Sequence, residues 1–386
     1  MDVSNRMSAI APSGSIAIAA KISKLRKSGE NIIGLNVGEP DFPAPDQVIK
    51  ATTKALKEGK TRYSLVRGED GLREEIANYY NRKYPRTISE ANVLVGNGSK
   101  QIIYNAFQAI LNEGDEVIIP IPYWVTIPES VKLAGGVNVL VDSKENFHLD
   151  LEKIKAKITP RTKAIYINTP NNPTGIVYTK EELIELGEIA KENNLFIVSD
   201  EAYEALVYDG TFVTPSTLSQ DLFDRTICIQ SFSKTFCMTG FRIGYMIANE
   251  NIIAHVDRFQ GHLCGNIAPF SQYGAIEALK TDNQIVSPLI EEMRKRRDLS
   301  YELFSKLFPC HRPEGAFYLF LDIKPYIESG LVRDSAHMVD YLIDNAKVAL
   351  VPGSSFGQEG YIRLAYTANQ KEIKEAFTRI SEVLRA

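Results

Sequence analysis

With 386 residues the chain is long for a single hydrophobic core, so two domains are the expected organisation. Its hydrophobic content of 44% and its charged content of 24% are typical of a soluble globular enzyme. The formal net charge is −4, and acidic and basic residues are mixed along the chain. This argues against a nucleic-acid-binding protein, which would need clustered basic residues.

Cysteine usage and hydropathy argue against several further classes. The four cysteines form no C-x-x-C pair, and their spacing suggests neither a disulfide framework nor a zinc site. We therefore expect no metal and a reducing, cytoplasmic setting. The first ten residues carry polar and charged side chains and do not read as a secretory signal. No apolar run approaches the roughly 18 residues that span a membrane, so no membrane association is expected.

The first predicted elements are a helix, a short strand and two further helices. Apolar spacing predicts a helix over 15–28 and a strand over 31–37. The strand ends at Gly38, in the turn Gly-Glu-Pro-Asp-Phe, where the missing side chain could let a ligand approach main-chain amides. An ordinary glycine–proline turn explains the same residues. Helices are predicted over 46–58 and 72–84.

A strand, a glycine turn and a helix follow. Residues 92–95 are predicted as a strand that closes in Gly96-Asn97-Gly98, and Ser99 opens a helix with an apolar face. The free amides and the dipole of such a helix start favour a phosphate group. The turn is neither G-x-G-x-x-G nor a P-loop, so a nucleotide is not implied. A plain strand-to-helix turn is the alternative.

The only tryptophan of the chain follows the next predicted strand, at 116–120. Most tryptophans pack in a core. Trp124, at the carboxyl end of a strand and near a proline-rich loop, could instead stack on a planar ring. A strand is predicted over 137–141, and a polar stretch then extends to Pro160.

Residues 163–168 are apolar and β-branched, which predicts a buried parallel strand. The strand ends in Thr-Pro-Asn-Asn-Pro-Thr-Gly, where two prolines lock the turn and the side-chain amides of Asn171 and Asn172 are available. A structural turn is the alternative, because Asn, Pro and Gly dominate turns in general. Two prolines and two asparagines in so short a turn favour a functional role for it.

An acidic residue ends the next predicted strand. Thr179 and Glu182 form a capping box at the start of a helix, and a strand is predicted over 195–199. Asp200 follows that strand directly, at the edge of the sheet where ligands bind in open α/β folds. A carboxylate there would keep a pyridine nitrogen protonated and make the ring an electron sink. An aspartate that caps a helix is the alternative.

The most informative stretch runs from Ser231 to Gly244, between predicted strands at 226–230 and 243–248. It places Lys234 in a loop at the end of a strand. A lysine amine forms a Schiff base with an aldehyde.

Two hydroxyls and one guanidinium accompany this lysine, from Ser231, Ser233 and Arg242. Together they suit a phosphate dianion. An aldehyde and a phosphate on one small molecule describe pyridoxal 5′-phosphate. A surface loop with a solvated lysine is the alternative.

The order of these elements predicts an α/β protein. Strands alternate with helices up to residue 248, so the sheet is expected to be mainly parallel and covered by helices on both faces. A long helix is predicted from Ser287, with Pro288 at its first position. The elements after it segregate as in a smaller α+β domain, with which the N-terminal helix is expected to pack; they are predicted at 315–321, 335–345, 348–351, 361–365 and 370–384.

Domain boundaries follow from this order. We expect an N-terminal segment over 1–36, a large domain over 37–285 and a small domain over 286–386. In the small domain, Arg363 stands among apolar neighbours on a strand and needs an anionic partner. Either a structural ion pair or the carboxylate of a substrate would supply it.

Taken together, these motifs resemble one known family. The motifs are S-x-S-K-T-x-x-M-T-G-x-R-x-G, N-N-P-T-G, S-D-E-x-Y, G-E-P-D-F and P-Y-W. Their order and spacing resemble the fold-type I, pyridoxal-phosphate-dependent aminotransferases of the aspartate aminotransferase family. The branch that is most similar is the bacterial and archaeal one called class I, subgroup beta. The resemblance runs from about Ser8 to the C-terminus and implies a seven-stranded sheet sandwiched by helices in the large domain.

The resemblance also implies roles for single residues. Lys234 would be the Schiff-base lysine and the base that moves the proton, and Asp200 the partner of the pyridinium nitrogen. Tyr203 and Asn172 would donate to the ring oxygen O3′, and Trp124 would stack on the ring. Arg363 would bind the substrate α-carboxylate, assisted by the Gly38 amide. The phosphate would be held by Ser231, Ser233, Arg242 and the amides of Ser99 and Lys100.

Two further implications concern the partner subunit and the substrate. Tyr63 matches a position that reaches the phosphate of a second subunit, so a homodimer with shared active sites is expected. The animal-type branch binds the distal carboxylate with a partner-subunit arginine, but residues 259–269 contain no arginine. In subgroup beta the lysine that matches Lys100 is associated with that carboxylate, which favours aspartate and glutamate. Alternatively, Lys100 only adds charge to the phosphate seat.

The predicted activity is reversible transamination of an L-amino acid and a 2-oxo acid by a ping-pong mechanism. One alternative is a broader aminotransferase that accepts aromatic oxo acids or prephenate. Another is a β-lyase on the same fold, since a fold alone does not fix the chemistry. A non-catalytic regulator is disfavoured, because about a dozen residues precede the first predicted helix and leave no room for a DNA-binding segment.

Overall fold

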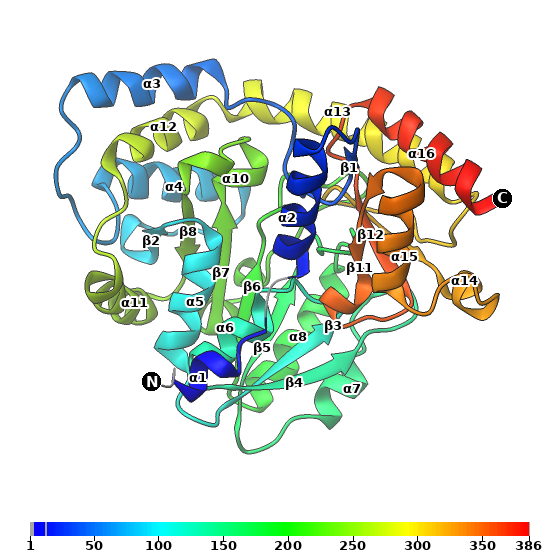
Figure 1. Cartoon of the computed structure of the whole chain (residues 1–386). Coiled ribbons are helices and arrows are strands. Elements are labelled where there is room, and N and C mark those ends of the chain that lie inside the picture. Colours follow the sequence, from blue (N-terminus) through cyan, green and yellow to red (C-terminus); the bar gives the residue numbers. More distant parts are fainter. Residues whose placement is uncertain (1–3, 12–13, 386) are drawn as a thin grey trace.

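The computed structural model describes residues 4–11 and 14–385. Its largest element is a seven-stranded sheet with the strand order β2-β8-β7-β6-β5-β3-β4 (Figure 1). Strand β8 is antiparallel to both of its neighbours, and the pairs on the β7 to β4 side are parallel, which confirms the predicted sheet. The strands are β2 (Val93–Gly96), β3 (Glu116–Ile121), β4 (Val137–Asp142), β5 (Thr162–Asn168), β6 (Phe196–Asp200), β7 (Thr226–Ser231) and β8 (Gly244–Ile247).

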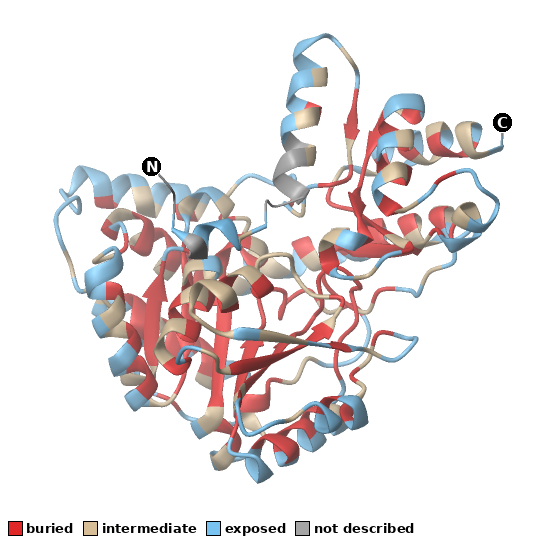
Figure 2. Ribbon diagram, turned by 60° about the horizontal axis from the view of Figure 1, so that its bottom comes forward, coloured by how far each residue is buried: buried red, intermediate tan, exposed pale blue. Residues whose placement is uncertain are grey.

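Helices cover both faces of this sheet, as the near-continuous apolar runs of β5, β6 and β7 require. Figure 2 shows the strands buried between helices whose outer sides are exposed. Helices α5 (Ser99–Ile110), α6 (Ile127–Leu133) and α11 (Glu250–Leu263) pack on one face. Two further clusters hold α4 (Asp70–Lys83), α7 (Leu151–Ala156), α8 (Lys180–Glu192) and α12 (Pro269–Lys280) on the sheet.

A smaller unit lies beside the large sheet (Figure 1). Its antiparallel sheet has the order β11-β12-β9, and β1 pairs in parallel with β10. The strands are β1 (Ile33–Gly34), β9 (Tyr318–Asp322), β10 (Val348–Ala349), β11 (Val351–Pro352) and β12 (Tyr361–Ala365). The long helix α13 (Asp282–Phe304) packs against β9 and α16 (Gln370–Arg385). The remaining helices are α1 (Asn5–Ser8), α2 (Gly14–Lys27), α3 (Asp46–Lys57), α9 (Gln220–Arg225), α10 (Phe232–Thr235), α14 (Lys324–Glu328) and α15 (Ser335–Tyr341).

The helix α2 contacts this smaller unit. The Lys21 amine donates to Asp340 Oδ1 at 2.5 Å, and Ile22 belongs to the same core cluster as Met338 and Ile343. The division into segments 1–36, 37–285 and 286–386 stays a prediction.

The strand predicted over 31–37 is much shorter in the structure, and only Ile33–Gly34 pairs as β1. Leu35 still makes backbone hydrogen bonds, with Ala349 and Ala365. Beyond it the carbonyls bind side chains instead, because Asn36 O accepts from Arg363 and Val37 O accepts from Thr367. The strand predicted over 348–351 is divided at Leu350, because β10 pairs with β1 whereas β11 pairs with β12.

Helix boundaries also differ from the prediction. Helix α13 starts at Asp282, so Pro288 lies inside it and not at its first position. Ile285 and Val286 pack against the core beside α4 and α12, which holds the turn before the proline in helical form. The polar stretch before Pro160 contains α7, whose N-cap Asp150 accepts from the Lys153 amide. The predicted capping box of Thr179 and Glu182 is present.

Over the part of the chain described here, we find no helix with the length and apolarity that a membrane crossing requires.

Candidate active site

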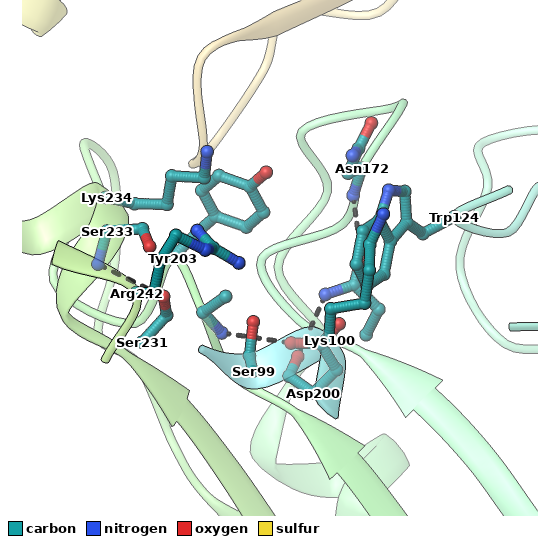
Figure 3. Close-up of a pocket in the computed structure, with 12 residues that line it drawn as sticks. Ser99, Lys100, Trp124, Asn172, Asp200, Tyr203, Ser231, Ser233, Lys234 and Arg242 are labelled. Atoms are coloured by element: carbon teal, nitrogen blue, oxygen red, sulfur yellow. Dashed lines mark hydrogen bonds between the residues drawn. The ribbon is translucent and has the colours of Figure 1, made fainter. Parts of the chain in front are cut away.

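A pocket opens where the carboxyl ends of β5, β6 and β7 meet the N-terminus of α5 (Figure 3). Parallel strands bring their carboxyl ends to one edge of a sheet, which is why motifs far apart in the sequence converge here. The pocket gathers every side chain predicted to touch the cofactor except that of Tyr63. Its lining residues are Ser99, Lys100, Trp124, Asn168, Asn172, Asp200, Ala202, Tyr203, Ser231, Ser233, Lys234 and Arg242.

Lys234 lies on the one-turn helix α10 and not in a loop, which corrects the sequence prediction. The helix forms because Ser231, at the end of β7, caps it by accepting from the Ser233 amide at 3.1 Å. The Lys234 amine donates to the carbonyl of Gly38 at 2.7 Å. Burial, together with the positive charges of Arg363 and Arg242, outweighs the nearby Glu39 carboxylate and lowers the pKa of Lys234 to about 8.

This lowered pKa has a measurable consequence in the ligand-free protein. A neutral amine is the reactive form, so labelling of Lys234 by an amine-selective acylating reagent should rise with pH and level off above about pH 8. Labelling of a solvated lysine side chain continues to increase until its pKa of about 10.4 is reached. Peptide mass spectrometry across a pH series measures this midpoint, with the exposed Lys50 of α3 as a reference for the reagent. A Lys234 midpoint near pH 10 would contradict the prediction.

Asp200 is buried at the end of β6. Its Oδ1 accepts from the Ala202 amide at 3.3 Å, and its Oδ2 accepts from the Tyr166 hydroxyl at 3.1 Å. Burial raises the pKa of Asp200 to about 6, and the Ala202 amide, the Tyr166 hydroxyl and the Lys234 charge oppose that rise. The carboxyl group is therefore mostly ionised at neutral pH, although it is enclosed by protein.

Hydroxyl and amide donors together with one guanidinium form an anion seat at one end of the pocket. Gly98 precedes α5 with φ +80°, and a Cβ atom there would come within 2.8 Å of an Arg242 nitrogen. The positive φ favours glycine, and a larger residue would have to displace this guanidinium from the helix start. Ser99, Ser231 and Ser233 add hydroxyl groups, so the charge and the hydrogen-bonding groups of the seat suit a phosphate.

Arg363 is buried on β12. It donates to Asn172 Oδ1 at 2.9 Å and to the Asn36 carbonyl at 2.7 Å, while its Nε has no hydrogen-bond partner within residues 4–11 and 14–385. Among the described residues no carboxylate pairs with it, so the structural ion pair considered above is not present there. A buried guanidinium with free donor capacity can bind a carboxylate from outside the chain.

Gly38 is required by packing. A Cβ atom at this position would lie 2.0 Å from the Tyr318 hydroxyl oxygen, so no larger residue fits. Tyr318 in turn exchanges a hydrogen bond with Tyr203 at 2.8 Å, and its ring lies 4.5 Å from the Arg363 guanidinium. Gly38 thus brings the backbone of its turn against the residues that surround the pocket.

Lys100 and Trp124 lie together on one side of the pocket. The Lys100 amine lies 5.2 Å from the centre of the Trp124 ring, a cation–π distance. Burial and the charge of Arg242 lower the pKa of Lys100. In the view of Figure 3, Trp124 and Asn172 stand across the pocket from Lys234.

Tyr63 does not reach this pocket, and its side chain is 100% exposed. It lies on the connection between α3 and α4.

Sequence reasoning missed Asn168, Tyr166 and Tyr318. Asn168 links two segments of the site, because its side chain donates to the Asp200 carbonyl at 2.9 Å and accepts from the Asn172 amide at 2.8 Å. A polar residue at the end of an apolar strand was the signal for it. The sequence around Tyr166 and Tyr318 gives no such indication, since each lies in an apolar strand where a tyrosine is expected to pack in the core.

Comparisons with known proteins identify the family of the chain. Residues 30–380 match the family model described as aminotransferase class I and II. The chain belongs to this family. It is 41% identical to a probable aspartate/prephenate aminotransferase of Aquifex aeolicus, with 99% of this chain and 98% of the relative covered. It is also 41% identical to the aspartate aminotransferase of Bacillus subtilis, with 98% of each covered.

A solved structure of the aspartate aminotransferase of Thermus thermophilus with maleate is similar over the whole length. The TM-score is 0.94 at 37% sequence identity, and the match covers 99% of this chain and 100% of the other. These findings confirm the family that the motifs predicted. In this aminotransferase, no group of three or more His, Cys, Asp or Glu side chains that could hold a metal occurs within residues 4–11 and 14–385.

Proposed function

We propose that this aminotransferase uses pyridoxal 5′-phosphate to move the amino group of L-aspartate or L-glutamate to a 2-oxo acid. The observation that carries the proposal is the convergence of three groups around one pocket. Lys234, with its enclosed amine, and Asp200, with its buried carboxylate, line the pocket. The third group is the buried guanidinium of Arg363, which donates to Asn172 of that lining and has no acidic partner among the described residues. Relatives and a structural neighbour that are named aspartate aminotransferases support the substrate class.

The chemistry of the side chains fits this cofactor. The seat formed by Ser99, Ser231, Ser233 and Arg242 suits its phosphate, and Trp124 offers an aromatic face to its ring. Asn172 and Tyr203 offer donors for the ring oxygen. When bound, pyridoxal phosphate supplies an aldehyde that forms Schiff bases with amines and a ring that accepts an electron pair.

The residues of the chain would then act on protons and on the substrate. Lys234 Nζ would take the proton from the substrate Cα, and its lowered pKa of about 8 leaves part of the amine neutral near physiological pH. The ionised Asp200 carboxylate would hold a proton on the ring nitrogen. Arg363 would bind the α-carboxylate with its planar fork, while Asn172 fixes the position of that guanidinium.

Spectroscopy with two substrates tests the proposal. The purified protein, loaded with pyridoxal phosphate, is mixed with L-aspartate and then with 2-oxoglutarate. We expect the cofactor spectrum to change with the first and to return with the second. Steady release of pyruvate and ammonia from an amino acid that carries a leaving group on Cβ, such as L-cysteine, without any oxo acid would instead indicate a β-lyase. A spectrum that responds to neither compound would contradict the proposal.

Lys100 is proposed to bind the distal carboxylate of an acidic substrate. Lys100→Ala should lower kcat/KM for L-aspartate by about 10- to 100-fold, the range for loss of one hydrogen bond to a charged group. The value for L-alanine should stay nearly unchanged, so this substrate serves as the internal control. If both values fell equally, Lys100 would belong to the phosphate seat and not to substrate selection.

We further propose a homodimer in which Tyr63 reaches the phosphate of the partner subunit. The complete exposure of Tyr63 and the exposure of Leu65 on the same connection support a surface that is covered by another chain. Sedimentation should give a dimer, and Tyr63→Phe should weaken binding of pyridoxal phosphate about tenfold by removing one hydrogen bond to a charged group. A monomer with unchanged cofactor affinity would overturn both statements.

The breadth of the substrate range is open to the same assays. Because one relative is named a probable aspartate/prephenate aminotransferase, prephenate belongs among the amino-group acceptors and donors to be compared. The cytoplasmic location stays a prediction from the sequence.

A further inference from the structure

A buried tyrosine hydroxyl stands directly behind the acid of the pocket. In the register of the parallel pair β5–β6, Asn168 lies opposite Asp200 and Tyr166 lies opposite Val198. Residues two apart on a strand share a face, so Tyr166, Asn168 and Asp200 project to the same side of the sheet. The Tyr166 hydroxyl reaches Asp200 Oδ2 at 3.1 Å.

The surroundings of Tyr166 are apolar. Its side chain is 2% exposed and belongs to the core cluster between the sheet and helices α5 and α6, with Val198 and Ile229 among its members. Within the described residues the structure gives its hydroxyl one hydrogen-bond partner, the Asp200 carboxylate. A buried hydroxyl costs free energy unless it is hydrogen-bonded. Packing of the ring and hydrogen bonding of the hydroxyl therefore both favour the orientation in which Tyr166 donates to Asp200.

We propose that Tyr166 is a positioning residue that keeps the Asp200 carboxylate charged and aimed into the pocket. The inference rests on the proposed function, in which Asp200 holds the proton of the ring nitrogen. Tyr166 would not touch the substrate or the cofactor and would act through Asp200 alone.

The balance of charges around Asp200 explains why one hydroxyl matters. Burial favours the neutral acid, and only the Ala202 amide and the Tyr166 hydroxyl donate to the carboxylate among the described residues. The other ionisable groups that face it are Lys234, Tyr203 and Tyr318. Burial raises the pKa of both tyrosines, so neither carries a charge, and their hydroxyls hydrogen-bond to each other at 2.8 Å and not to Asp200.

Titration of Asp200 in the protein without cofactor tests the proposal directly. Aspartate labelled with ¹³C at the carboxyl carbon gives NMR signals that follow ionisation, and Asp200→Asn identifies the signal of interest. In Tyr166→Phe, which keeps the ring, the Asp200 midpoint should rise by about one pH unit, as expected for loss of a hydrogen bond to a charged group. A midpoint equal to that of the unmodified protein would overturn the proposal.

A matched control and a substitution that should shift the Asp200 midpoint in the opposite direction complete the design. Tyr326→Phe removes a hydroxyl that donates to the Leu307 carbonyl at 2.8 Å outside the pocket, and it should leave the Asp200 midpoint unchanged. Replacement of Tyr166 by 3-fluorotyrosine makes the hydroxyl a stronger donor at nearly constant volume and should lower the midpoint. This second variant decides the question if Tyr166→Phe does not fold, and an unchanged midpoint in it would count against the proposal.

The loaded enzyme supplies an independent readout. In Tyr166→Phe the alkaline shift of Asp200 should move the acidic limb of the kcat profile to higher pH, whereas a purely structural role would lower kcat equally at all pH values. Equilibrium dialysis with pyridoxal phosphate distinguishes failure of the proposed function from failure of the role proposed for Tyr166. If the unmodified protein did not bind the cofactor, the proposed function would fail, while the titration would still decide whether Tyr166 controls Asp200.

Discussion

Replacement of Lys234 by alanine should lower kcat for transamination by about 10³-fold or more, because general acid–base catalysis by a positioned group typically contributes 10²- to 10⁴-fold. The amine is enclosed beside Gly38, and its pKa of about 8 suits a group that must both take up and release a proton near neutral pH. Lys100, the other amine of the pocket, lies over Trp124 and is not placed to substitute for it. Stopped-flow absorbance with L-aspartate measures the effect.

The control for this substitution is a surface lysine. Lys306→Ala removes an exposed side chain just beyond the end of α13 that pairs with Glu302 of that helix, and it should leave kcat unchanged. Circular dichroism and the Tm should show that Lys234→Ala is folded. A kcat within tenfold of that of the unmodified enzyme would show that Lys234 is not the group that transfers the proton.

Substitution of Arg363 by lysine should lower kcat/KM by about 10²- to 10³-fold for acidic and uncharged amino acids alike. Lysine keeps the charge but loses the planar fork, and with it two charge-assisted hydrogen bonds worth roughly 1.5–3 kcal/mol each to a bound carboxylate, part of which the ammonium recovers. The substitution also leaves the Asn36 carbonyl and Asn172 Oδ1 without their present donor. Steady-state kinetics with L-aspartate and L-alanine measures both values.

The pattern across substrates identifies the group that Arg363 binds. Every amino acid carries an α-carboxylate, so a uniform loss supports that assignment, whereas Lys100→Ala should affect acidic substrates selectively. Arg312→Lys changes an exposed arginine that pairs with Asp298 and serves as the matched control. A loss confined to aspartate in Arg363→Lys would mean that this guanidinium binds the distal carboxylate.

The parts of the site that could be predicted are those that topology brings together. Asp200, Asn172 and Lys234 each follow an apolar strand, and the carboxyl ends of parallel strands share one edge of the sheet. The mainly parallel sheet, covered by helices on both faces, followed from the alternation of buried strands with amphipathic helices. For this reason the positions of these side chains could be anticipated without knowing any contact between them.

The parts that could not be predicted depend on contacts between distant segments. Tyr166 meets Asp200 only because β5 and β6 pair in one register, and Tyr318 faces Gly38 only because the turn after β1 packs against β9 of the smaller unit. Likewise, Pro288 reads as a helix start until Ile285 and Val286 bury the turn that precedes it. Local propensity contains none of this information.

The pairing of β1 with β10 ties the order of synthesis to the order of folding. Ile33 pairs with Val348, and Ile22 and Leu35 share one core with residues as late as Ile380. A chain is made from its N-terminus, so these apolar side chains leave the ribosome first and obtain their partners last. Contacts this distant in sequence form slowly. Until the C-terminal residues emerge, the N-terminal segment is an exposed hydrophobic stretch that chaperones would recognise.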